Sequence, residues 1–172
     1  MSLPHALLTS LIERPSAGSD LARRFDSSIA FFWPATHQQI YRELARMERA
    51  GWVEATPDTK GRRKVYTCLP AGRAELERWV HEPSEAPVVR DALLVRLRAD
   101  AALGPLGVEG HLRTRLADHE RRLAAYEEIA VRDFGVVQGR AARVQRAILD
   151  AGISYETQSA QWCRTALAAL GA

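Results

Sequence analysis

The sequence predicts a mainly α-helical protein with a small β-hairpin, built as two consecutive domains. Apolar residues recur at intervals of three and four over most of the 172 residues, which is the spacing of amphipathic helices. The region 52–69 departs from this spacing and carries two short β-rich runs around a turn. Residues 82–87 are polar and contain two prolines, as in a linker. We therefore expect an N-terminal domain over 1–81 and a helical C-terminal domain over 88–172.

Two short helices are predicted first. Apolar residues between Leu3 and Ile12 have helical spacing, and Pro15 to Gly18 end that pattern. Ser19 is a residue type that caps helix N-termini, so it predicts the start of a second helix that ends near residues 27–28.

A third helix is predicted from residues 35–36 to Ala50. Pro34 stops any helix that would run through it, and Gly51 supplies a C-terminal stop. Its apolar positions alternate with hydroxyl, amide and cationic groups that suit base edges and phosphates. These candidate DNA-reading residues are Thr36, His37, Gln38, Gln39, Tyr41 and Arg42. Taken alone, the segment also fits an amphipathic surface helix with no ligand.

A hairpin with a basic tip is predicted next, with strands over 52–56 and 64–69 and a turn over 57–61. Both lysines of the chain fall here within five residues, in the cluster Lys60, Arg62, Arg63 and Lys64. Residues 1–80 also carry the whole net charge of +3, so we interpret the cluster as a phosphate-contacting patch. A solvated loop is the alternative, and Lys64 can instead support the strand.

The remaining sequence predicts helices only. Pro70 opens one helix at a first helical position, and another covers about 89–103. Two longer patterns follow, with seams spaced alternately by four and three residues as in coiled coils. The first seam is Leu112, Leu116, His119, Leu123, Tyr126 and Ala130, and the second is Val144, Ile148, Ala151, Tyr155, Gln158, Trp162, Thr165 and Ala169. Because residues 135–139 permit a turn, we expect these helices to fold back on each other and to bury a face in a partner.

The order helix, helix, turn, helix and basic hairpin is that of a winged helix-turn-helix. In that fold the third helix enters the DNA major groove and the hairpin reaches along the backbone. The fold class is therefore a winged helix-turn-helix domain followed by a helical, coiled-coil-like domain, and the expected partner is double-stranded DNA.

The first 80 residues closely resemble the PadR family of bacterial transcriptional regulators. The resemblance rests on the runs SAGSDL (16–21), FWPATHQQIYREL (32–44), ERAGWV (48–53), GRRKVY (61–66) and AGR (71–73). The later run DAGISYE (150–156), with Trp162, resembles the dimerisation domain of the longer, virulence-activator type. The resemblance implies a homodimer on an inverted-repeat operator, usually as a repressor, and in some members a small aromatic effector that releases DNA. The alternative is a helical protein-interaction module that has lost DNA binding, but the retained basic cluster argues against it.

Other functional classes find little support in the sequence. We see no metal-binding spacing of histidines, no HExxH, GxGxxG, Walker A or GxSxG motif, and expect neither an enzyme nor a cofactor. Cys68 and Cys163 lie 95 residues apart without a CxxC pattern, which favours a reducing compartment. No apolar run is long enough to span a membrane, so we expect a cytoplasmic protein.

An effector site is the least constrained expectation. Aromatic residues exceed what the short helices need, and ligand pockets favour aromatic linings. The candidate pocket residues are Trp33, Trp79, Tyr155 and Trp162. Packing in the core is the alternative role for these side chains.

Overall fold

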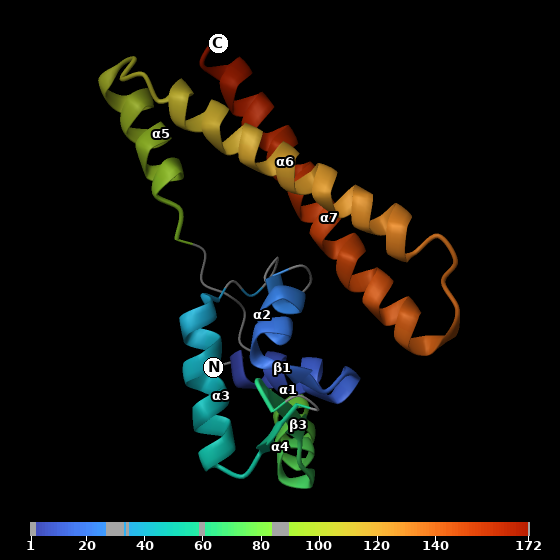
Figure 1. The fold of residues 1–172 in the computed structure, drawn as a ribbon. Helices are drawn as coiled ribbons and strands as arrows, with labels where there is room; N and C mark the ends of the chain where they lie inside the picture. Colours follow the sequence, from blue (N-terminus) through green and yellow to red (C-terminus); the bar gives the residue numbers. More distant parts are fainter. Residues whose placement is uncertain (1–2, 27–32, 34, 59–60, 84–89, 172) are drawn as a thin grey trace. The chain divides into compact units, whose positions relative to one another are not determined.

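A computed structural model describes residues 3–26, 33, 35–58, 61–83 and 90–171 of the chain (Figure 1). The chain divides into two compact units, an N-terminal unit, Met1–Ala86, and a C-terminal unit, Pro87–Ala172. Among the described residues, no helix combines the length and the apolar character that crossing a membrane requires.

The N-terminal unit has the predicted order of helices around a single apolar core. Its elements are α1 (Leu3–Glu13), β1 (Ser16–Ala17), α2 (Gly18–Asp26), α3 (His37–Arg49), β2 (Val53–Pro57), β3 (Lys64–Cys68) and α4 (Pro70–Val80). Side chains from α1, α2, α3 and the sheet form the core, which comprises Leu7, Leu8, Leu11, Leu21, Ala22, Phe25, Ile40, Leu44, Met47, Val53 and Tyr66. This shared core fixes α3 against the first two helices.

The sheet has one strand more than the sequence predicted. The hairpin of β2 and β3 is confirmed, and β1 adds to its other side in the order β1-β3-β2, with Ser16 opposite Tyr66. Two residues are too few to show an alternating pattern, so β1 carried no periodic signal. The prediction that Ser19 caps α2 is wrong, because α2 begins at Gly18, directly after β1, and Ser19 lies inside its first turn.

Two glycines of this unit lie at close approaches between elements. A Cβ on Gly18 would lie 2.6 Å from Cε1 of Tyr41, so the Tyr41 ring rests against the first turn of α2. A Cβ on Gly72 would lie 2.3 Å from the carbonyl oxygen of Trp52, so α4 packs directly on the backbone that leads into β2. The first contact brings α3 beside α2, and the second brings α4 against the residue before β2.

The C-terminal unit is a long helical hairpin with one shorter helix beside it. It consists of α5 (Ala92–Leu103), α6 (Glu109–Asp133) and α7 (Gly139–Ala169), and α6 and α7 run side by side (Figure 1). The seam predicted on α6 is confirmed, because Leu112, His119 and Tyr126 are buried. Tyr126 packs over Gly152 of α7, where a Cβ would lie 3.0 Å from its ring.

On α7, a different stripe from the predicted seam is buried. The buried residues of this helix are Glu156, Ala160, Cys163 and Leu167, whereas Val144, Ile148 and Tyr155 of the predicted seam are exposed. Both stripes have helical spacing and lie side by side on the helix surface. Periodicity alone does not say which of two neighbouring stripes faces α6.

Candidate nucleic-acid interface

Helix α3 presents one buried and one exposed face. Ile40, Leu44 and Met47 are fully buried in the core. All six predicted DNA-reading residues are exposed: Thr36, His37, Gln38, Gln39, Tyr41 and Arg42. The structure therefore brings these groups together at the N-terminal end of the helix.

Thr36 and Gln39 also form the N-terminal cap of α3. The Thr36 hydroxyl accepts a hydrogen bond from the Gln39 backbone N–H (3.2 Å), and the Gln39 Oε1 accepts one from the Thr36 N–H (2.8 Å). This reciprocal pair is a capping box, which satisfies backbone donors that the helix itself leaves open. Gln39 thus has a structural role that its residue type did not reveal, whereas the Gln38 side chain makes no such cap.

The wing turn is held by Asp58 and Gly61. The Asp58 carboxylate accepts a hydrogen bond from the backbone N–H of Arg62 (2.9 Å), and Gly61 adopts a positive φ of 66° that favours glycine. Arg62 and Lys64 project from this turn as exposed side chains that form no ion pair within the described part of the chain. Lys60 lies outside the described residues.

Arg63 differs from its neighbours because it is bound to two carboxylates. Its guanidinium contacts Asp20 of α2 (3.0 Å) and Asp58 of the turn (3.2 Å). Hydrogen bonds from Arg23 and the charge of Arg63 hold the pKa of Asp20 below its ordinary value. Arg63 therefore ties the wing to α2, a role that the sequence pattern did not indicate.

A hollow of about 280 Å³ lies where the start of α2, helix α3 and the wing meet. It is lined by Ala17, Gly18, Ser19, Tyr41, Arg63, Lys64 and Tyr66. Gly18 and Ser19, the first residues of α2, are part of this lining, and N–H groups at a helix N-terminus attract anions such as phosphate. Sequence reasoning missed this part of the surface, because it depends on the pairing of β1 with β3.

Other reactive groups do not gather into a catalytic or metal site in the portion that the structure describes. No group of three or more His, Cys, Asp or Glu residues there is placed to hold a metal ion. Burial raises the pKa of both Cys68 and Cys163, which keeps the thiols protonated.

The four residues predicted to line an effector pocket have different surroundings. Trp79 stacks on His5, with ring centroids 4.3 Å apart. Trp162 packs against the apolar cluster of α5, α6 and α7, and Trp33 is an exposed side chain. Tyr155 lies edge-on to His119 at 6.2 Å and lines a cavity of the C-terminal unit.

Comparison with known proteins matches both units. Residues 7–78 match the transcriptional regulator PadR-like family, and residues 89–171 match the virulence activator alpha C-terminal family. The chain is 39% identical to the probable transcriptional regulator Rv1176c of Mycobacterium tuberculosis over 94% of each chain. It is 31% identical to the negative transcriptional regulator PadR of Bacillus subtilis over 54% of this chain and 53% of that protein.

Solved structures extend the likeness to the whole fold. The virulence activator AphA of Vibrio cholerae superposes with a TM-score of 0.84 and 31% identity, over 99% of this chain and 98% of that one. Bacillus subtilis PadR in complex with operator DNA superposes with a TM-score of 0.81 and 21% identity, over 98% and 97%. The fold is therefore a winged helix-turn-helix followed by a helical C-terminal part.

Proposed function

Because the chain belongs to the PadR family of transcriptional regulators, we propose that it represses transcription by binding an inverted-repeat operator as a homodimer. The observation that carries this proposal is the common surface formed by the exposed face of α3, the wing and the first turn of α2. Cationic, amide and hydroxyl groups gather there on a rigid support, and the excess positive charge of the chain lies in this half.

Within this surface, α3 reads bases and its surroundings hold phosphates. Gln38 and Arg42 carry the fork-shaped groups that pair with adenine and guanine edges in the major groove. Tyr41 lines the hollow at the start of α2, and its hydroxyl contacts the DNA backbone. Arg62 and Lys64 contact phosphates on the wing side, and Arg63 positions that wing through its two carboxylates.

The C-terminal unit supplies the contact between two copies. Val144 and Ile148 of α7 and Leu94 and Val95 of α5 are large apolar side chains that are exposed in the single chain. A second copy related by a two-fold axis covers these residues and sets two α3 helices about 34 Å apart, one turn of DNA.

Repression and an effector are supported by the relatives. The Bacillus subtilis relative is named a negative regulator, and a structure of that protein contains p-coumaric acid. We extend both properties to this chain as part of the proposal: it lowers transcription, and a small aromatic molecule releases it from DNA. Deleting the gene of this protein tests the direction of regulation. Higher activity of a promoter reporter in the deletion strain supports repression, and lower activity indicates activation.

A mobility-shift assay with the promoter region of the protein's own gene tests DNA binding. We expect a shift that an excess of a scrambled duplex does not remove. Arg42→Ala weakens the shift, while Arg49→Ala, at the far end of the same helix, leaves it unchanged, because the Arg49 side chain bonds the carbonyl of Ala45 (3.2 Å). Absence of any shift with the full chain contradicts the proposal and favours a protein-interaction module.

A further inference from the structure

The turn that connects α6 with α7 has an apolar composition. Residues 134–138 read Phe, Gly, Val, Val and Gln, whereas connecting turns are ordinarily rich in polar residues, glycine and proline. Val131, just before this turn, and Val136, within it, are each 79% exposed. We call residues 131–143 the hairpin tip, which is orange in Figure 1. Large apolar side chains that gather in water at one place indicate an interaction surface.

The positive excess of the C-terminal unit also lies at the hairpin tip. Residues 87–172 hold twelve arginines and ten acidic residues, and the hairpin tip holds three of these arginines and one of these acids. The other nine arginines are balanced by nine acids, so the tip alone carries the two excess charges of the unit. Arg132 pairs with Asp133 at 2.8 Å. The excess therefore belongs to Arg140 and Arg143.

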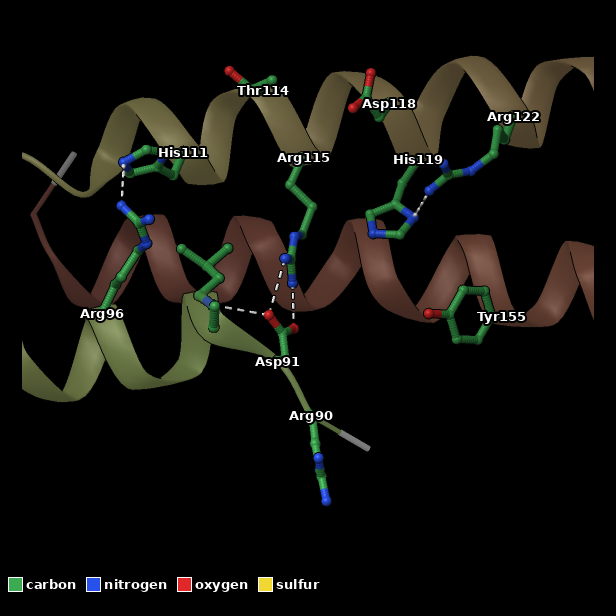
Figure 2. Close-up of a pocket in the computed structure, with 12 residues that line it drawn as sticks. Arg90, Asp91, Arg96, His111, Thr114, Arg115, Asp118, His119, Arg122 and Tyr155 are labelled. Carbon is green, nitrogen blue, oxygen red and sulfur yellow. Dashed lines mark hydrogen bonds and ion pairs between the residues drawn. The ribbon is translucent and has the colours of Figure 1, made fainter. Parts of the chain in front are cut away.

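Some arginines elsewhere in this unit have a structural role because they bridge helices. A cavity of about 710 Å³ lies between the start of α5 and the helices α6 and α7. Beside it, Arg115 of α6 donates to Asp91, the N-cap of α5, at 3.0 Å (Figure 2). Arg122 of α6 donates to Glu156 of α7 at 2.9 Å. These contacts connect the three helices with one another.

Arg140 and Arg143 have no such structural role. Both are exposed, and neither forms an ion pair in the part of the chain that the structure describes. Arg140 lies in the first turn of α7, where the positive end of the helix dipole disfavours a cation. The next arginine along this helix, Arg146, is by contrast paired with Asp150 at 2.8 Å. The stability of the hairpin does not account for Arg140 and Arg143, so we look for their partner in another molecule.

The chemistry of the hairpin tip selects the kind of partner. Protein interfaces combine an apolar core with arginines, and a cationic surface attracts a negatively charged partner. A second copy of this chain has a net charge of +3 and offers no negative excess. The phosphate backbone of duplex DNA supplies negative charge, but it offers exposed valines no apolar surface. An acidic protein segment that also carries apolar side chains matches both properties.

We propose that the hairpin tip is a docking surface for an acidic segment of another protein. Carboxylates of the segment contact Arg140 and Arg143, and its apolar side chains cover Val131 and Val136. Clusters of arginines recognise acidic motifs in this way in other complexes. The hairpin tip shares no residue with α3, the wing or α2, so this surface goes beyond the proposed function and does not use the residues that carry it.

Fluorescence anisotropy of three labelled synthetic peptides with the full chain tests the partner class. The peptides have equal length and repeat Glu with Leu, Glu with Ser, or Lys with Leu. We expect saturable binding of the Glu–Leu peptide, at least tenfold weaker binding of the Glu–Ser peptide and none of the Lys–Leu peptide. Absence of Glu–Leu binding overturns the proposal. Equal binding of the Glu–Leu and Glu–Ser peptides overturns its apolar part.

Two double variants test the location. Arg140→Gln with Arg143→Gln is expected to weaken binding of the Glu–Leu peptide at least tenfold. The matched control Arg98→Gln with Arg113→Gln removes the same charge from exposed positions of α5 and α6 outside the hairpin tip, and it is expected to stay within twofold. Equal losses in the two double variants overturn the assignment. Unchanged melting temperatures show that both variants are folded.

Further measurements separate the proposed partner from other occupants. An equal loss of peptide binding in Arg62→Gln with Lys64→Gln places the peptide on the wing. A changed sedimentation profile of the variant altered at Arg140 and Arg143 shows that a second copy covers the tip. Weaker binding of a scrambled duplex by that variant assigns the tip to DNA, and loss of binding to phosphatidylglycerol vesicles assigns it to a membrane surface. Each of these results overturns the proposal.

A mobility shift on the same preparations separates this inference from the proposed function. Operator binding is expected to stay within twofold in the variant altered at Arg140 and Arg143. Operator binding without peptide binding by the unaltered chain refutes only the docking surface. Peptide binding without operator binding leaves the docking surface assigned and refutes the proposed function.

Discussion

Removing positive charge from the wing is expected to change the salt dependence of DNA binding in a residue-specific way. Arg62 and Lys64 are exposed and form no ion pair within the described residues, so both are available to phosphates. Arg63 already contacts Asp20 at 3.0 Å and Asp58 at 3.2 Å. The informative comparison is therefore the double variant Arg62→Gln with Lys64→Gln against Arg63→Gln alone.

The magnitude follows from counterion release. Each phosphate contact contributes about 0.9 to the slope of log affinity against log salt, so losing two contacts lowers the slope by about 1.8. Raising the salt from roughly 50 to 200 mM weakens DNA binding by both proteins. The loss of affinity is then about 12-fold smaller for the double variant than for the unaltered protein. Arg63→Gln leaves the slope nearly unchanged, because its charge is already balanced, and reduces affinity only by loosening the wing.

Fluorescence anisotropy with a labelled operator fragment and a scrambled duplex, at four salt concentrations, measures both slopes. The double variant is expected to change both duplexes alike, because phosphates carry no sequence information. The reasoning is refuted if Arg63→Gln lowers the slope as much as the double variant, or if the double variant leaves the slope unaltered. The second result assigns the cluster to a solvated loop.

Three further predictions concern α3, α7 and α4. Gln38→Ala is expected to change the rank order of operator variants in binding affinity, because a lost base contact costs about 1–3 kcal/mol of binding free energy. Gln39→Ala is expected to lower the free energy of unfolding by about 1 kcal/mol, because it removes the capping box. Ile148→Glu places a charge on the exposed stripe of α7 and is expected to give a folded monomer in sedimentation velocity. Hydrogen bonds from Arg78 and His5 lower the pKa of Glu75 from 4.5 to about 2. Glu75→Gln therefore removes stability present above pH 4.5, on the order of 1 kcal/mol, and flattens its acid loss between pH 4.5 and about 2 in chemical denaturation.

Each of these predictions has a control and a contrary outcome. If Gln39→Ala alters operator preference while Gln38→Ala does not, the assignment of reader and cap is reversed. Ala147→Glu changes an exposed α7 residue outside the predicted stripe, so a dimer lost equally in this control argues against the stripe. If the free energy of unfolding of Glu75→Gln depends on pH as it does in the unaltered protein, the contacts of Glu75 with His5 and Arg78 do not stabilise the fold.

Much of the N-terminal unit was predictable because its signals are local. Gly51 and Pro70 mark helix ends through their own backbone properties, and the structure confirms α3 within one or two residues of its predicted bounds and α4 starting at Pro70. Pro70 starts α4 although Leu69 offers no side-chain cap. The exposed positions of Gln38, Gln39, Tyr41 and Arg42 follow from helical spacing, because Ile40, Leu44 and Met47 must face the core, whereas Thr36 and His37 are exposed because they lie at the very start of the helix.

Contacts between residues far apart in the chain were not predictable in this way. Arg63 meets Asp20 across 43 residues, and the cavity combines residues 90–122 with Tyr155. The sequence by itself determined the helices, the hairpin and the charged face, since each depends on spacing and residue type within a few turns. Only the tertiary structure decided which stripe of α7 is buried and which wing arginine is paired with carboxylates, because these depend on how side chains from separate elements pack and pair.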